Sequence, residues 1–281
     1  MAFRTLISTD ALAARLGDPA FAIVDCRFRL DDVGWGEREW RAGHIPGAAY
    51  AHLDRDLSGP KTGTNGRHPL PDVAALAQTF GRLGITSGRQ VVAYDQDNGM
   101  FASRLWWLSR WVGHDAVALL DGGFAKWLSE GRPISAVQEQ PEPVDFQPAP
   151  RAGMTVTADE VASLRRDPEW RLVDSRAPER YRGEVEPIDP IAGHIPGATN
   201  YFFQQNISER GTFRTPEDLR ARWAPVIGAV APERVVCYCG SGVQACQNLL
   251  ALEHAGVSGV RLYPGSWSEW CSDPSRPVGP Q

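Results

Sequence analysis

The chain has 281 residues, of which 42% are hydrophobic and 22% charged, a composition typical of a soluble globular protein with room for two ordinary domains. Its 29 basic and 34 acidic residues give a net charge of −5 and form no basic stripe, so we expect no nucleic-acid partner. No apolar run approaches membrane length and the amino terminus shows no secretory pattern, so we expect a cytoplasmic protein without a membrane partner.

The five cysteines are odd in number and lack C-x-x-C pairs, which disfavours a disulfide framework and structural zinc. We therefore expect reduced thiols and no metal.

Two halves of the sequence repeat each other. The repeated pairs are I-V-D-C-R (23–27) with L-V-D-S-R (172–176), G-H-I-P-G-A (43–48) with the same letters at 193–198, and V-V-A-Y (91–94) with V-V-C-Y (235–238). Because the order and the offsets agree, the sequence predicts two tandem domains, 1–133 and 154–281. The stretch between them, 134–153, contains four prolines and little periodicity and is predicted to be a linker.

Strand and helix patterns alternate in each half. In the first half they predict strands at 21–25, 90–94 and 116–120 and helices at 71–83 and 101–111. In the second half they predict strands at 171–174, 234–238 and near 260–262, and helices at 158–166, 217–226 and 244–254. Thr157 and Glu160 form the pattern of a capping box before the first of these helices. This alternation predicts an α/β protein in which each domain is a parallel sheet flanked by helices on both faces.

A predicted strand of the second half ends at Cys239, and a glycine-rich turn and a helix follow. Gly240 and Gly242 allow the backbone to curl, so that amides of the loop and of the helix start, at Val243 and Gln244, point at one spot. A cysteine at the base of such a ring is expected to be stabilised as its thiolate, which is the nucleophilic form.

Free cysteine is often simply a small buried hydrophobe. Cys239 differs because it lies at the carboxyl end of a predicted parallel strand, where open α/β sheets bind ligands, so we favour a functional role there. A core role is favoured for the other cysteines: Cys26, Cys237, Cys246 and Cys271. The first half has Asp95 where the second has Cys239, so the first domain is expected to lack the nucleophile and to supply contacts only.

In their order and spacing, these motifs resemble the tandem-domain rhodanese-like sulfurtransferases, the family of thiosulfate sulfurtransferase and 3-mercaptopyruvate sulfurtransferase. The resemblance covers nearly the whole chain and includes the C-G-S-G-V loop at 239–243 and the closing G-S-W-S-E-W at 265–270. It implies an active C-terminal rhodanese domain that works without a cofactor. It also implies that Cys239 takes sulfur from a small anionic donor as a persulfide and passes it to cyanide, a thiol or a thiol protein.

The resemblance also bears on the donor. The C-G-S-G-V loop is similar to mercaptopyruvate-type loops, whereas thiosulfate-type loops carry basic residues after the cysteine. Arg180 matches the first of two arginines that hold the donor's carboxylate in that family, and Arg182 is a further candidate. The second arginine has no clear counterpart, since Ile188 or Asp189 lies near its expected place. Both donors therefore stay open at this point.

Mercaptopyruvate-type enzymes pair a loop serine with a histidine and an aspartate of the first domain, so the resemblance implies a catalytic role for Ser241. His44 with Asp31 or Asp32 are the candidates, although the repeated G-H-I-P-G-A turn favours a structural role for His44. Arg104 is a candidate for contacting the donor, with an interdomain ion pair as the favoured alternative.

Two other functions also use a cysteine in a loop of this kind. A cysteine-based phosphatase also holds an anion in such a loop, but where phosphatases place the arginine that closes the loop this chain has Ala245. A noncatalytic rhodanese-fold module, binding a partner or sensing oxidants through Cys239, is the alternative from a different class.

Overall fold

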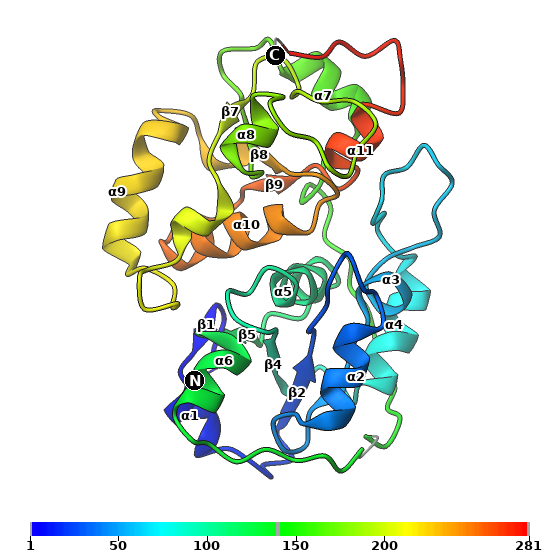
Figure 1. Ribbon diagram of the computed structural model, residues 1–281, viewed down its shortest axis with the longest axis vertical. Coiled ribbons are helices and arrows are strands. Elements are labelled where there is room, and N and C mark those ends of the chain that lie inside the picture. The colour runs from blue at the N-terminus through cyan, green and yellow to red at the C-terminus, as the bar shows by residue number, and fades with distance from the viewer. Residues whose placement is uncertain (1, 139–140, 280–281) are drawn as a thin grey trace. The chain divides into compact units, whose positions relative to one another are not determined.

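The computed structural model describes residues 2–138 and 141–279 (Figure 1). The chain divides into two compact units. Unit 1 consists of Met1–Gly59, Pro71–Arg151 and Ile207–Phe213, and unit 2 of Pro60–Leu70, Ala152–Asn206 and Arg214–Gln281. Each unit thus contains a short segment from the other half of the sequence, which the predicted boundaries did not include. Residues 139 and 140 of the predicted linker, and the predicted domain ends at 1, 280 and 281, lie outside the described part.

Unit 1 contains a parallel sheet with the strand order β1-β5-β4-β2-β3. The strands are β1 (Leu6–Ile7), β2 (Phe21–Asp25), β3 (Ala49–Tyr50), β4 (Gln90–Tyr94) and β5 (Val117–Leu120). The helices are α1 (Thr9–Ala13), α2 (Trp35–Ala42), α3 (Leu53–Asp56), α4 (Val73–Arg82), α5 (Ala102–Trp111) and α6 (Gly123–Ser129). Because strand side chains alternate between faces, Ile23 and Val92 share one core with Leu12 of α1 and Trp127 of α6.

Unit 2 contains a parallel sheet with the order β7-β6-β8-β9. The strands are β6 (Arg171–Asp174), β7 (Thr199–Asn200), β8 (Val235–Tyr238) and β9 (Arg261–Leu262). The helices are α7 (Ala158–Leu164), α8 (Pro178–Tyr181), α9 (Pro216–Ile227), α10 (Gln244–His254) and α11 (Ser266–Trp270), with single turns η1 (Phe203–Asn206) and η2 (Pro232–Arg234). Leu172 and Val236 pack with Val161 of α7 and Trp267 of α11. The predicted class, parallel sheets flanked by helices, is confirmed.

The predicted elements are observed with small shifts at their ends. The predicted strands 21–25, 90–94 and 171–174 match β2, β4 and β6, and both halves of the Thr157–Glu160 capping box form. α7 ends two residues before the predicted 166. The two-residue strands β1, β3 and β7 were missed, because two residues are too few to show an alternating pattern.

The repeated D-x-R segment forms a buried ion pair. In unit 2, Nη2 of Arg176 lies 2.7 Å from Oδ2 of Asp174, and both side chains are fully buried. The same Nη2 donates to the carbonyl of Gly193 at 2.7 Å, and the guanidinium lies over the ring of Trp267. The end of β6 is thereby fixed to the second G-H-I-P-G-A turn and to α11.

Unit 1 repeats this arrangement with different aromatic partners. Arg27 pairs with Asp25 at 2.7 Å, donates to the carbonyl of Gly43 and lies over the ring of Phe124. The hydroxyl of Tyr94 donates to the same carboxylate at 2.7 Å. The D-x-R segment, the G-H-I-P-G-A turn and the V-V-x-Y strand, which are separate in the sequence, therefore meet in one buried network in each unit.

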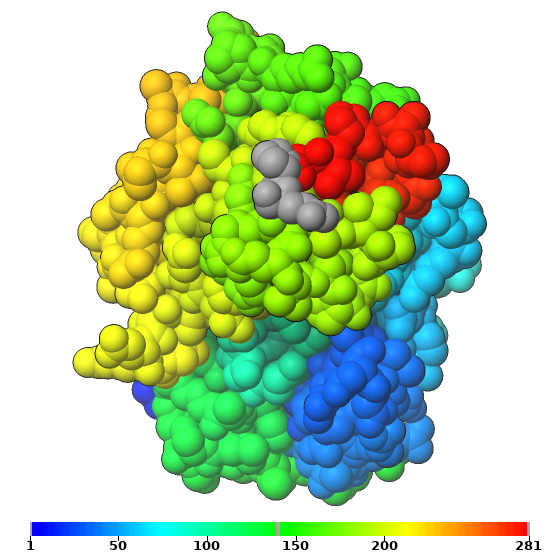
Figure 2. Space-filling view, turned by 45° about the horizontal axis from the view of Figure 1, so that its top comes forward, coloured from blue at the N-terminus to red at the C-terminus, as the bar shows by residue number. Residues whose placement is uncertain are grey.

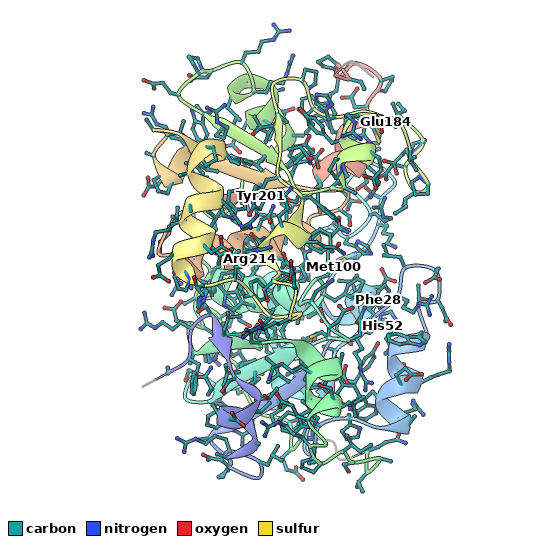
Figure 3. All side chains as sticks on the ribbon, turned by 60° about the vertical axis from the view of Figure 1, so that its left-hand side comes forward. Phe28, His52, Met100, Glu184, Tyr201 and Arg214 are labelled. Atoms are coloured by element: carbon teal, nitrogen blue, oxygen red, sulfur yellow. The ribbon has the colours of Figure 1, made fainter. Side chains whose placement is uncertain are left out.

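Aromatic contacts fill both units. In unit 1 the rings of Phe28 and His52 meet edge to face with centroids 5.2 Å apart (Figure 3). In unit 2 the ring of Tyr201 stacks on that of Trp223 at 3.9 Å, and burial raises the pKa of the Tyr201 hydroxyl to about 12.

Within the described ranges, every helix is too short or too polar to cross a bilayer.

Replacing Arg176 by methionine tests the buried network. Arg176→Met leaves the carboxylate of Asp174 buried without its cation, so we expect the free energy of unfolding to fall by about 3–5 kcal/mol. Arg27→Met is the matched change in unit 1, and Arg182→Met, at an exposed pair, is the control. Urea unfolding followed by tryptophan fluorescence measures the effect, and an Arg176→Met protein as stable as the control would contradict it.

Candidate active site

The loop that follows β8 connects Cys239 to the first turn of α10. Val243 is the N-cap of α10 and Gln244 its first residue. Gly242 has φ 74°, and a Cβ on it would lie 2.4 Å from the carbonyl oxygen of Pro264. Only glycine fits there, because both the positive φ and the close approach exclude a side chain.

Helix α11 holds this loop in place. The amides of Trp267 and Ser268 donate to the carbonyls of Cys239 and Gly240 at 3.0 and 2.9 Å. The amide of Cys239 donates to Oγ of Ser266 at 3.1 Å. Ser266 has φ 56°, a left-handed conformation that costs serine about 1–3 kcal/mol and tends to persist at functional sites. The peptide groups around Cys239 therefore have fixed directions.

Unit 1 shows what the equivalent loop can bind. The buried carboxylate of Asp95 accepts hydrogen bonds from the amides of Gly99 (2.9 Å), Phe101 (2.8 Å) and Ala102 (3.1 Å), at the start of α5. Burial raises the pKa of Asp95 to about 6, while these hydrogen bonds to its carboxylate oppose the rise. The loop and helix start thus converge on an anion at the position that Cys239 occupies in unit 2.

Cys239 is 1% exposed, and two guanidinium groups lie beside the next residue, Gly240. Nη2 of Arg67 lies 2.9 Å, and Nη1 and Nη2 of Arg180 lie 3.6 and 3.7 Å, from where a Cβ of Gly240 would be. Nε of Arg67 is buried and has no acceptor among the described residues. The amide of Arg67 donates to Oγ of Ser268 at 2.9 Å. The loop is therefore covered by two cations, one of which retains a free N–H donor.

Sequence reasoning missed Arg67. It lies in Pro60–Leu70, a segment of the first half that belongs to unit 2 and shows no helical or strand periodicity. The sequence feature that could have pointed to Arg67 is the pair of basic residues Arg67 and His68, which follows a turn-forming T-G-T-N-G stretch.

The histidine beside Ser241 is His68, which the sequence analysis did not name, and His44 has the contacts of the structural role that was favoured for it. Nδ1 of His68 lies 2.7 Å from Oγ of Ser241, and both side chains are buried. Nδ1 of His44 instead lies 2.6 Å from the carbonyl of Trp40, on whose ring it stacks. His194 makes the same pair of contacts with Tyr181 in unit 2. The structure thus places His44 in a repeated turn.

The two candidate arginines of α8 differ in their surroundings. Arg180 is 12% exposed and donates to Glu186 at 2.6 Å. Arg182 is 53% exposed and pairs with Glu184 at 2.6 Å. The three atoms nearest to the Gly240 Cβ position belong to Arg67 and Arg180, none to Arg182. Arg180 thus lies beside the Cys239 loop, whereas Arg182 pairs with Glu184 at the surface.

The remaining candidates lie in unit 1. Arg104 of α5 is buried, and its Nε donates to the carbonyl of Leu57 at 3.3 Å. Asp31 and Asp32 are paired with Arg29 and Arg38 at the surface. Both aspartates belong to unit 1, whereas Cys239, Arg67, His68 and Arg180 belong to unit 2.

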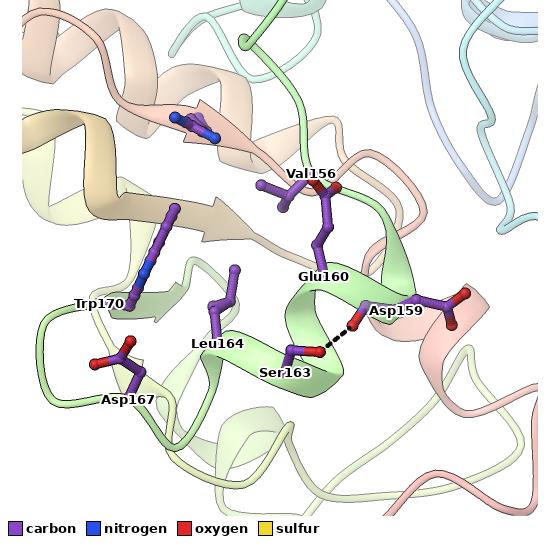
Figure 4. Close-up of a pocket in the computed structure, with 8 residues that line it drawn as sticks. Val156, Asp159, Glu160, Ser163, Leu164, Asp167 and Trp170 are labelled. Atoms are coloured by element: carbon purple, nitrogen blue, oxygen red, sulfur yellow. Dashed lines mark hydrogen bonds between the residues drawn. The ribbon is translucent and has the colours of Figure 1, made fainter.

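A separate hollow of about 520 Å³ lies beside α7 in unit 2 (Figure 4). The residues that line it include Asp159, Glu160, Asp167 and Arg261, whose guanidinium lies over the ring of Trp170. It holds no cysteine, and its acidic groups disfavour an anionic ligand.

Across residues 2–138 and 141–279, His, Cys, Asp and Glu form no group of three that could hold a metal ion.

Comparison with known proteins finds a matching family, curated relatives and solved structures that agree with one another. The family described as "Rhodanese-like domain" matches residues 8–130 and 157–273. The chain is 46% identical over 280 residues to the "Probable 3-mercaptopyruvate sulfurtransferase" of Pseudomonas aeruginosa, covering 99% of each chain. It is 34% identical to the thiosulfate sulfurtransferase of Cricetulus griseus over 95% of this chain and 92% of that one. The crystal structure of SseA from Escherichia coli, titled as a 3-mercaptopyruvate sulfotransferase, superposes with a TM-score of 0.82 at 28% identity, covering 94% of this chain and 99% of that chain.

The two loop glycines give a matched test of the geometry. Gly242→Ala places a methyl group against a backbone carbonyl at positive φ, so we expect the free energy of unfolding to fall by about 2 kcal/mol or more. Gly240→Ala meets only the movable end of Arg67, so its stability is expected to stay within about 1 kcal/mol of the wild type. Denaturant unfolding of both variants measures the difference, and equal stabilities would show that the loop is not constrained as described.

Proposed function

The chain belongs to the rhodanese-like family and is a sulfurtransferase, and we propose that it takes sulfur from 3-mercaptopyruvate onto Cys239 as a persulfide. One observation carries the choice of site and donor. Two arginines and a Ser241–His68 hydrogen bond surround the Cys239 loop, while the loop itself contains no charged residue.

The arginine pair suits the carboxylate of the donor. Arg67 and Arg180 come from different segments and present guanidinium groups to the same side of Gly240. A carboxylate is held well by guanidinium N–H groups, and the buried Nε of Arg67 needs an acceptor. Binding there would place the rest of a three-carbon donor next to Cys239.

The sulfur-transfer step balances without a cofactor. The Cys239 thiolate attacks the thiol sulfur of 3-mercaptopyruvate, an S–S bond forms and the C–S bond breaks. The electron pair of the C–S bond passes to the three-carbon fragment as the enolate of pyruvate. The thiol proton of the donor ends on the methyl carbon of pyruvate, and the persulfide keeps the negative charge.

The Ser241–His68 pair favours 3-mercaptopyruvate over thiosulfate. Breaking the C–S bond creates an enolate, which needs a hydrogen-bond donor at its oxygen and a proton at its carbon. The hydroxyl of Ser241, hydrogen-bonded to the ring of His68, can serve both needs. Thiosulfate loses sulfite as a stable dianion and needs neither. The name of the Pseudomonas aeruginosa relative agrees with this choice.

The persulfide is proposed to be stabilised by the loop amides, as the carboxylate of Asp95 is in unit 1. An acceptor thiol or cyanide then attacks the outer sulfur and releases the Cys239 thiolate. All five cysteines are unpaired thiols, which fits the proposed cytoplasmic location.

Replacing the nucleophile tests the proposal. Cys239→Ser removes the sulfur that is attacked, so we expect pyruvate formation from 3-mercaptopyruvate and a thiol to fall at least about 1000-fold. Cys26→Ala, at a buried cysteine of unit 1, is the control and should retain activity. Intact-mass spectrometry after the donor alone should show one added sulfur in the control and none in Cys239→Ser.

Full turnover in Cys239→Ser would exclude this residue as the sulfur carrier. Oxidation of Cys239 without any donor-dependent turnover in the wild type would favour the noncatalytic module over the enzyme.

The arginine pair is tested by three single substitutions. Arg67→Ala and Arg180→Ala each remove a charge-assisted hydrogen bond to the donor, so the KM for 3-mercaptopyruvate should rise about 10- to 100-fold. Arg182→Ala removes an exposed arginine from the same segment and should leave KM unchanged. Steady-state assays measure all three, and equal KM values for the Arg180 and Arg182 variants would remove Arg180 from the donor site.

A further inference from the structure

The two arginines beside the Cys239 loop are joined by one carboxylate, that of Asp189. Its Oδ1 contacts Nη1 of Arg67, and its Oδ2 lies 3.1 Å from Nη2 of Arg180. The side chain of Asp189 is only 3% exposed. Each carboxylate oxygen thus serves a different arginine, and Asp189 bridges the pair.

A second carboxylate, Glu186, is bound differently. It accepts from Nε and Nη2 of Arg180, from Nη1 of the buried Arg176 and from the amides of Ile188 and Asp189. These bonds make Glu186 part of the framework that shapes the segment. The hydrogen bonds of the Asp189 side chain run to Arg67 and Arg180, the same groups that the donor needs.

The charges of the two arginines and the two carboxylates affect how an anionic donor can bind. The two cations of the donor site are matched by two carboxylates, so little positive charge is left for an incoming anion. A donor carboxylate that binds both arginines must take over bonds that Asp189 makes. Burial raises the pKa of Asp189, and the positive charge of Arg67 opposes this rise.

We propose that Asp189 determines donor specificity: its carboxylate bridges the arginine pair in the free enzyme, gives way to the carboxylate of a monoanionic thiol-bearing 2-oxo acid, and repels a dianionic donor such as thiosulfate. The proposal rests on the proposed function, since it concerns the same site. It assigns a role to a residue that neither attacks sulfur nor moves a proton. Like-charge juxtaposition of this kind is a common way for a site to reject a competing ligand.

The test is the ratio of kcat/KM for thiosulfate to kcat/KM for 3-mercaptopyruvate. Asp189→Asn keeps the shape and removes the charge, so repulsion of the dianion is relieved more than that of the monoanion, and the ratio should rise about tenfold. Asp189→Glu keeps the charge and should leave the ratio near the wild-type value.

The matched control lies in the segment between α8 and β7, which forms part of the surface of unit 2 (lime green in Figure 2). Glu184→Gln removes an exposed negative charge from this same segment (Figure 3) and should leave the ratio unchanged. A rise in Glu184→Gln as large as in Asp189→Asn would mean that net charge alone sets the ratio, and would overturn the proposal.

Two further outcomes separate this inference from the proposed function. If the wild type turns over neither donor, the proposed function itself fails. If the wild type is active but Asp189→Asn lowers kcat/KM for both donors by the same factor, Asp189 merely positions the arginines and the specificity role is overturned.

If the Asp189 variants do not fold, inhibition of the wild type still tests the proposal. Pyruvate, a monoanion, should inhibit competitively with 3-mercaptopyruvate at concentrations at least about tenfold below those of sulfate, a dianion. The reverse order would overturn the proposal without any substitution.

Discussion

The attachment of the Cys239–Gly240 dipeptide to α11 is the constraint on which the site depends. Amides of Trp267 and Ser268 hold the two carbonyls, and the hydroxyl of Ser266 holds the amide of Cys239. These bonds fix the peptide directions of the loop, and the buried pair of Asp174 and Arg176 fixes α11 in turn through the ring of Trp267. The loop can then present its amides and its sulfur with little motion, which is how a site stabilises charge at low reorganisation cost.

The duplication supplies an internal comparison. Both units carry the same ion pair, the same G-H-I-P-G-A turn and the same loop before a helix, yet unit 1 has Asp95 where unit 2 has Cys239. In unit 1 the carboxylate of Asp95 accepts hydrogen bonds from three amides of this loop and helix start. In unit 2 the neutral loop leaves the charge balance to Arg67, Arg180 and Asp189, which lie outside the loop. We propose that this difference leaves unit 1 with a structural role and unit 2 with the reactive cysteine.

Much of the fold follows from the sequence because the longer strands and helices have full periods of alternating or helical pattern, as β2, β4, β6 and α10 show. The Cys239 loop was also predictable, since the strand, the two glycines and the helix are contiguous in sequence. The roles of Arg67 and His68 were not, because their segment leaves one half of the sequence to join the unit formed by the other half. The local pattern of a segment carries no information about which unit the segment joins.

The most direct test of the central claim is a crystal structure of the wild-type enzyme after exposure to 3-mercaptopyruvate without an acceptor. The account predicts one additional sulfur atom bonded to Sγ of Cys239 and within hydrogen-bonding distance of the loop amides. An additional sulfur on another cysteine, or an unmodified Cys239 in crystals that release pyruvate, would contradict it.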